Sequence, residues 1–195
     1  MNEIEDGDYL FYADAGSYFK DSVCKIIEAS KDHFQDIFPF EVNFTEKSYT
    51  KRDLFLHFKC DTSDYTNSNM RMATFILFKK SEHSIKFIKD WLKACENYNL
   101  ISDAKNVLGA PNYEQFVNHR HDQSIFSLLC KKWSLEAFRD PSQYGNFDYY
   151  KYKNSLVYGQ ILQLTRLNFT FKERIKYYLL LLKKFTKKCI NDSCC

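Results

Sequence analysis

The sequence is poor in glycine and proline and contains no long apolar run. Only 5 glycines and 3 prolines occur among 195 residues, which argues against repeat-rich β architectures, because these need many tight turns. No apolar run reaches the roughly 18 residues that a membrane-spanning helix requires. Aromatic residues make up 17% and hydrophobic residues 45% of the chain. A disordered polypeptide is therefore excluded, and the length indicates one folded domain.

The sequence also lacks the cysteine and histidine spacings of a zinc site. Its 7 cysteines are an odd number at wide spacings, without a Cys-x-x-Cys pair. Cys95 and Cys130 fall within apolar helical patterns, so we interpret them as small core residues. The acidic N-terminus has no basic segment ahead of an apolar one, and no signal peptide is predicted. These features predict a reducing, cytoplasmic location.

Positive charge is concentrated near the C-terminus. Residues 171–189 contain seven basic residues and one acidic residue, whereas the whole chain has a formal net charge of only +3. Apolar residues recur there at helical spacing opposite the lysines, as in a basic amphipathic helix on an anionic membrane or a terminal helix docked on the domain. We therefore expect a core at residues 1–165 and a helical tail at 166–195. We expect no nucleic-acid binding, since the basic residues are not spread over the domain.

Strand and helix patterns alternate along most of the chain. Apolar runs at residues 9–13 and 72–78 predict strands buried on both faces. Residues 40–44 alternate like a half-buried strand, and residues 135–138 predict a short last strand. Helical segments are expected at residues 17–31, from residue 50, at 81–95, after residue 112 and from residue 122. This alternation predicts an α/β fold.

A carboxylate and a glycine follow the first predicted strand, in the sequence Asp14-Ala15-Gly16. Ligands of α/β sheets bind beyond the carboxyl ends of the strands. Asp14 is therefore placed to position a metal ion or a diphosphate. Gly16 would allow a sharp turn or the close approach of a ligand. The alternative is an aspartate that serves a turn or a helix cap.

A dense polar cluster lies far downstream, where residues 119–124 read His-Arg-His-Asp-Gln-Ser. Histidine and aspartate can ligate a metal, and arginine can bind a phosphate through two parallel hydrogen bonds. An aspartate at a helix start, such as Asp122, can hold a sugar hydroxyl or act as a general base, or it can cap the helix. The density of these groups favours a functional site. What that site does depends on whether it meets Asp14 in space.

Residues 50–53, Thr-Lys-Arg-Asp, are a weaker candidate. A helix start with mixed charges is usually a solvent-exposed face. Lys51 or Arg52 at a phosphate is the functional alternative.

Together these segments resemble bacterial glycosyltransferases of the GT-A fold that take part in capsule and lipopolysaccharide assembly. The resemblance rests on residues 12–17, 50–55 and 119–129 and covers about residues 7–138. The run from His119 to Ser124 is its most specific part. The resemblance implies a partial GT-A-like, Rossmann-like mixed sheet flanked by helices, followed by the basic amphipathic helix.

The resemblance further implies transfer of a sugar from a nucleotide-sugar donor to a glycan or a lipid-linked acceptor. Asp122 and Gln123 would be catalytic and face the donor sugar or the acceptor. The residues that would hold the donor are Asp14, Ala15, Gly16, Lys51, Arg52 and Arg120. A divalent metal ion, Mn²⁺ or Mg²⁺, would be held by Asp14, His119 and His121. A lipid-linked acceptor would place the protein peripherally at the inner face of the membrane, attached through residues 171–189.

The chain departs from this family pattern in two respects. Gly16 replaces the second acid of the Asp-x-Asp motif of the fold, which leaves one carboxylate for a metal. In such enzymes the nucleotide is held by strands that precede this motif, and here few residues precede Asp14. The alternative hypothesis is therefore a truncated, non-catalytic pseudo-enzyme or a module that binds a membrane or a partner.

Overall fold

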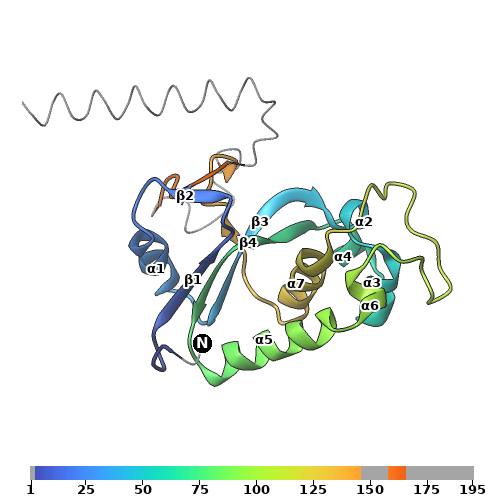
Figure 1. Cartoon of the computed structure of the whole chain (residues 1–195), viewed down its shortest axis with the longest axis horizontal. Helices are drawn as coiled ribbons and strands as arrows, with labels where there is room; N and C mark the ends of the chain where they lie inside the picture. The colour runs from blue at the N-terminus through green and yellow to red at the C-terminus, as the bar shows by residue number, and fades with distance from the viewer. Residues whose placement is uncertain (1–2, 146–157, 166–195) are drawn as a thin grey trace, which may run out of the picture. The chain divides into compact units, whose positions relative to one another are not determined.

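The computed structural model of the chain describes residues 3–145 and 158–165. The described residues up to Leu164 belong to one compact unit, which is built on a four-stranded sheet of order β1-β4-β3-β5 (Figure 1). Its strands are β1 (Tyr9–Ala13), β3 (Ile37–Thr45), β4 (Asn69–Lys79) and β5 (Phe138–Arg139). β1 and β3 run antiparallel to β4, and β5 runs parallel to β3. A second, antiparallel sheet pairs β2 (Ser17–Phe19) with β6 (Leu162–Leu164).

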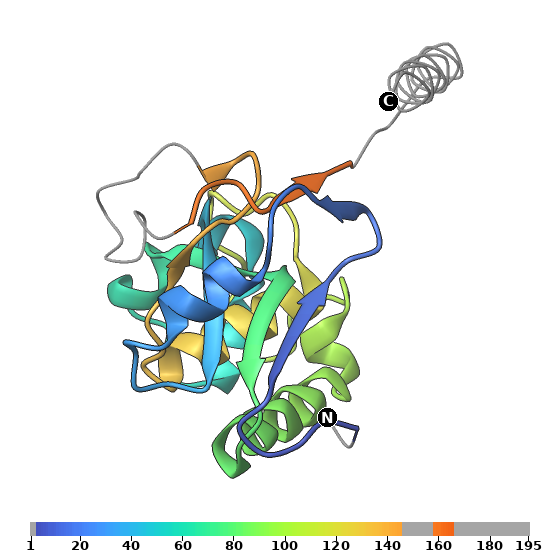
Figure 2. The same cartoon turned by 90° about the vertical axis from the view of Figure 1, so that its left-hand side faces the viewer.

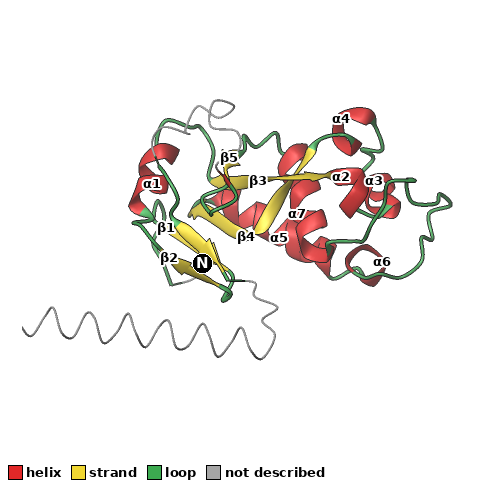
Figure 3. Cartoon of the chain, turned by 90° about the horizontal axis from the view of Figure 1, so that it is seen from above, coloured by secondary structure: helices red, strands yellow, loops and turns green. Residues whose placement is uncertain are grey.

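Helices cover both faces of the four-stranded sheet. They are α1 (Cys24–Ser30), α2 (Glu46–Tyr49), α3 (Arg52–His57), α4 (Ser63–Thr66), α5 (Glu82–Cys95), α6 (Tyr98–Ile101) and α7 (His121–Lys132). α5 and α7 lie side by side (Figure 3) and share one core cluster with β4. α1 shares the cluster on the opposite face with residues 158–162. The predicted α/β class, with a mixed sheet flanked by helices, is confirmed.

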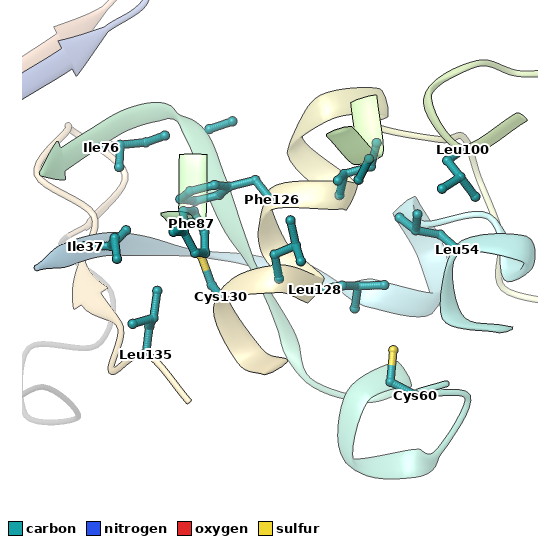
Figure 4. Packing of buried hydrophobic residues seen from close by; sticks show 14 of the residues in the cluster. Ile37, Leu54, Cys60, Ile76, Phe87, Leu100, Phe126, Leu128, Cys130 and Leu135 are labelled. Carbon is teal, nitrogen blue, oxygen red and sulfur yellow. The ribbon is translucent and has the colours of Figure 1, made fainter. Parts of the chain in front are cut away.

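The alternation of side chains along β4 assigns them to the two clusters. Ile76 and Phe78 pack with α5 and α7, whereas Phe75 and Leu77 pack with α1. On the α5/α7 face, the rings of Phe87 and Phe126 meet edge to face with centroids 5.7 Å apart (Figure 4). Each fully buried side chain of this size contributes about 1.5–3 kcal/mol relative to its exposed state. These contacts fix α7, and therefore the polar residues at its start, against β4.

The helix predicted at residues 81–95 is confirmed as α5. The Ser81 side chain accepts a hydrogen bond from the Ser84 amide at 3.0 Å, and the Ser84 hydroxyl accepts one from the Ser81 amide at 3.0 Å. This reciprocal capping satisfies two backbone amides that a helix start leaves without partners. Cys130 lies in the core as expected, with 0% exposure, whereas Cys95 is only partly buried.

The prediction that residues 9–13 form a strand buried on both faces is wrong. β1 is an edge strand of the sheet, and each of its residues is at least partly exposed. A run of apolar residues shows that a strand packs against a core, but it does not show how many strands flank it.

The helix predicted at residues 17–31 is also wrong in its first half. Ser17 closes a turn instead, because its amide and its hydroxyl donate to the Asp14 carbonyl at 3.1 and 2.6 Å. β2 then pairs with β6, from the far end of the described chain. The local spacing of apolar residues cannot predict pairing with a strand so far away in the sequence.

The segment after residue 112 forms no helix, and residues 102–120 connect α6 to α7 as a loop. The last strand of the larger sheet is β5, at the end of the predicted segment 135–138. None of the helices within residues 3–145 and 158–165 is both long and apolar enough to cross a membrane. The helix expected at 166–195, with the proposed membrane face at 171–189, lies outside the described residues.

Candidate functional site

Asp14 lies directly beyond β1 and continues its pairing with β4. Its amide donates to the Thr74 carbonyl at 3.0 Å, and its carboxylate accepts a hydrogen bond from the Tyr12 hydroxyl at 3.0 Å. Residues two apart on a strand share a face, and Leu10 packs against the core on the α5/α7 face. Tyr12 and Asp14 therefore lie on the face of the sheet that α5 and α7 cover.

The start of α7 lies on the same face of the sheet. Asp122 lies exposed in the first turn of α7, and its carbonyl accepts a hydrogen bond from Trp91 Nε1 of α5 at 3.2 Å. The pKa of Tyr12 is raised, first by its hydrogen bond to Asp14, then by burial and by the negative charges of Asp14 and Asp122. Two carboxylates that are far apart in sequence therefore act on one tyrosine. We call Tyr12, Asp14, Trp91 and Asp122 the candidate site.

The candidate site opens to solvent. Tyr12 is 47% exposed, and Ala15 and Gly16 are exposed beside Asp14. No atom lies within 4 Å of the position that a side chain on Gly16 would occupy, and Gly16 has no left-handed φ. Among the described residues, nothing therefore requires a glycine at this position.

His119 is buried, and both of its ring nitrogens are engaged within the protein. Nδ1 accepts the Lys51 amide hydrogen at 3.3 Å, and Nε2 lies 2.8 Å from the Leu100 carbonyl. Burial is the main cause that lowers the pKa of His119 to about 4, so the ring is neutral at pH 7 and Nε2 carries the proton. This geometry gives His119 a structural role, because neither nitrogen has a lone pair left for a metal.

His121 occupies the strained first position of α7. Its φ of 48° is rare for a residue with a side chain, and such strain concentrates at functional sites. Its Nε2 lies 3.2 Å from the exposed Asp103 carboxylate. Within the described ranges, no three His, Cys, Asp or Glu side chains are grouped closely enough to hold a metal ion.

Lys51 and Arg52 are held by internal contacts. The Lys51 side chain is buried, and its ammonium donates to the carbonyls of Asn99 at 2.8 Å and Ala104 at 2.7 Å. The Arg52 guanidinium pairs with Asp61 at 3.1 Å and lies 4.7 Å from the centre of the Tyr113 ring. The structure therefore does not bring either side chain to Asp14.

Arg120 and Gln123 have polar groups that the described residues leave available. The Arg120 guanidinium lies over the rings of Tyr49, at 5.1 Å, and Phe44, at 5.7 Å. Its buried Nε has no hydrogen-bond partner among the described residues. Gln123 is half-buried in the first turn of α7.

Asp53 fixes the loop 102–120 in a way that the sequence pattern did not indicate. The buried Asp53 carboxylate accepts the amide hydrogens of Val107 at 2.7 Å and Leu108 at 3.1 Å. Asn112 accepts the Arg52 amide hydrogen at 2.9 Å. We call the two hydrogen bonds to the Asp53 carboxylate the clamp. The mixed charges of residues 50–53 suggested an exposed face and therefore did not indicate it. An aspartate directly before the apolar residues 54–56, near a helix start, was the available signal.

A hollow of about 480 Å³ lies at the opposite end of β1 from Asp14. It is lined by Tyr9, His33, His83 and Lys79, together with neighbouring residues. None of the predicted site residues lines it. The effect of both Asp14 and Asp122 on Tyr12, rather than this hollow, therefore defines the candidate site.

Comparisons with known proteins identify no relative of the chain. No protein-family model, curated protein or solved structure matches it.

Proposed function

We propose that the chain is a glycosyltransferase that moves a sugar from a nucleotide-sugar donor to a glycan or a lipid-linked acceptor. The observation that supports this is the approach of Asp14 and Asp122 to one tyrosine, Tyr12, on the α5/α7 face of the sheet. Open α/β sheets bind ligands at the carboxyl ends of their strands, and Asp14 follows such an end. In this proposal the mixed sheet is part of a GT-A-like fold.

The proposed reaction breaks the bond between the anomeric carbon and the phosphate oxygen and forms one to an acceptor hydroxyl oxygen. The nucleoside diphosphate leaves, and the acceptor gives up its hydroxyl proton. Asp122 is exposed and free to take this proton or to hold a sugar hydroxyl, with the Gln123 amide one residue away. Arg120, the residue that precedes α7, supplies positive charge for the diphosphate.

Asp14 acts on the donor side of the proposed site. Its carboxylate fixes the Tyr12 hydroxyl by accepting its hydrogen bond. The described residues do not form a closed cage for Mn²⁺ or Mg²⁺, because both His119 nitrogens are engaged and His121 faces Asp103. No step of the proposed reaction is therefore assigned to a metal.

A non-catalytic binding module is the second candidate. It is favoured by the internal contacts of Lys51, Arg52 and His119, three residues that the resemblance assigned to donor or metal binding. This candidate predicts no nucleotide-sugar turnover. Its attachment to an anionic membrane through residues 171–189 would be lost when those residues are deleted.

The test is turnover of nucleotide sugars by the full chain. UDP-, GDP- and dTDP-linked hexoses are incubated with the protein, with Mn²⁺, with Mg²⁺ or with EDTA, and the released nucleoside diphosphate is measured. We expect release from at least one donor. Asp122→Asn is expected to lower kcat at least a hundredfold, because a positioned base contributes about 10²–10⁴ in rate. Asp14→Asn is expected to lower the rate at least tenfold.

Asp64→Asn is the matched control, because Asp64 is an exposed aspartate on α4, outside the candidate site. It is expected to retain full activity. Equal rates for Asp14→Asn, Asp122→Asn and this control would remove the roles assigned to the two carboxylates. Absence of turnover with every donor would favour the binding module.

A further inference from the structure

The register of β1 on β4 determines which backbone groups of β1 remain at its outer edge. The Asp14 amide donates to Thr74, and the Lys80 amide donates to Asp8. In an antiparallel ladder, residues bonded to the partner strand alternate with residues whose N–H and C=O point the other way. Since the residues bonded to β4 are the even-numbered ones, Tyr9, Phe11 and Ala13 present their amides and carbonyls at the outer edge.

No strand pairs with this outer edge in the part of the chain that the structure describes. β1 ends the order of the four-stranded sheet, and Figure 2 shows it as the strand beyond β4. Residues 9–13 contain no charged residue, proline or glycine. Natural edge strands usually carry such residues to prevent pairing. β1 lacks these features and has the properties of a strand that accepts a partner.

The segment that leads into β1 is acidic, whereas Lys79, opposite Tyr9 on β4, lies on the inner side of the strand. Four exposed acidic residues lie at the amino end of β1: Glu3, Glu5, Asp6 and Asp8. Lys80 lies 3.4 Å from Asp6, and it is the basic partner that the structure gives this group. A strand that binds here therefore gains from lysine or arginine at the end beside these acids.

In the antiparallel register centred on Phe11, a second copy of this chain fits the edge poorly. If two β1 strands paired antiparallel about Phe11, Asp8 of one copy would lie opposite Asp14 of the other. Like charges directly opposite each other destabilise a strand pair. The occupant favoured by the charge is therefore a different polypeptide.

We propose that the outer edge of β1 binds an extended segment of another protein by strand addition. The segment pairs with the backbone of Tyr9, Phe11 and Ala13, is apolar at its centre, and carries basic residues at the end beside residues 3–8. Backbone hydrogen bonds supply affinity in this binding mode, and alternate side chains supply specificity. The proposal goes beyond glycosyl transfer and does not depend on it, although β1 also carries Tyr12 next to Asp14.

The test begins with a display library of random ten-residue peptides selected on the full chain. We expect the selected peptides to alternate apolar residues and to carry lysine or arginine at one end. A fluorescent copy of the strongest binder is then titrated with the protein. Two sets of peptides are then compared, one with methylated backbone nitrogens at the odd-numbered residues and one at the even-numbered residues. One set should bind at least tenfold more weakly and the other should change little, because only every second amide of the peptide faces β1.

Variants of Ala13 test the protein side. Ala13→Pro removes an amide that faces outward and spares the bonds to β4, so we expect at least tenfold weaker binding. Ala13→Val keeps the amide and should bind like the unchanged chain. The methylated peptides decide the matter even if Ala13→Pro does not fold, since they use the unchanged protein. The proposal would be overturned if no peptide were selected, or if methylation at odd-numbered and at even-numbered residues weakened binding equally.

Discussion

Buried His119 joins the segment before α7 to the residues around α3 through its two ring nitrogens. His119 was recognised in the sequence as part of the polar run 119–124, and the resemblance implied that it binds a metal ion. Whether a histidine is buried depends on the loop 102–120 and on α6, which only the folded chain brings together. The internal contacts of Lys51 were hidden from the sequence for the same reason, since its carbonyl partners lie on residues 99 and 104.

His119 makes stability depend on pH. Burial lowers the pKa of His119 from its usual 6.5 to about 4 in the folded state. The unfolded chain therefore binds a proton between these values that the folded chain does not. The contribution of neutral His119 to the free energy of unfolding is fully present above pH 6.5. It falls by on the order of 3 kcal/mol as the pH drops from 6.5 to 4. Urea unfolding at pH 7 and pH 4.5 measures this loss.

The control is His119→Gln, which cannot take up the proton. We expect the variant to be less stable at pH 7 and to lose less stability between pH 7 and 4.5 than the unchanged chain. The same loss in both proteins would mean that His119 titrates normally and is not buried as described.

Individual elements were predictable where their signals were local. α5 combines a capping serine with apolar residues at helical spacing, and both are read from the consecutive residues 81–95. β2 and the loop 102–120 were mispredicted because their partners are distant: β2 pairs with β6, and Asp53 clamps the loop. Edge position was equally hidden, because pairing order is a property of the whole sheet.

The clamp between α3 and the loop gives a prediction for Asp53. Asp53→Ala removes both acceptors of the Val107 and Leu108 amides. Hydrogen bonds to charged groups contribute about 1.5–3 kcal/mol each. For the two bonds we therefore expect a loss of about 3–6 kcal/mol in the free energy of unfolding, measured with urea. Hydrogen exchange at these two amides should become faster.

Asp64→Ala is the comparison for this experiment. Asp64 is exposed on α4, and surface substitutions of this kind usually change stability by less than about 0.5 kcal/mol. If Asp53→Ala matched Asp64→Ala in stability and in the exchange of both amides, the clamp would not exist.

For the whole molecule, the decisive result is where the sheet places the two polar clusters. The α/β class could be predicted because strands and helices alternate in sequence. The influence of both Asp14 and Asp122 on Tyr12 could only be inferred from the resemblance, because it requires α7 to pack on β4 beside α5. The large aromatic residues Phe87 and Phe126 hold that arrangement.

The ionisation of Tyr12 tests this arrangement most directly. The Tyr12 pKa is raised by Asp14 and, to a smaller extent, by Asp122. NMR titration of tyrosine labelled with ¹³C at Cζ, assigned with Tyr12→Phe, measures it in the full chain. We predict that Asp14→Asn lowers the Tyr12 pKa most, that Asp122→Asn lowers it less, and that Asp64→Asn leaves it unchanged. A Tyr12 pKa that responds to Asp122→Asn no more than to Asp64→Asn would show that the two clusters do not share one site.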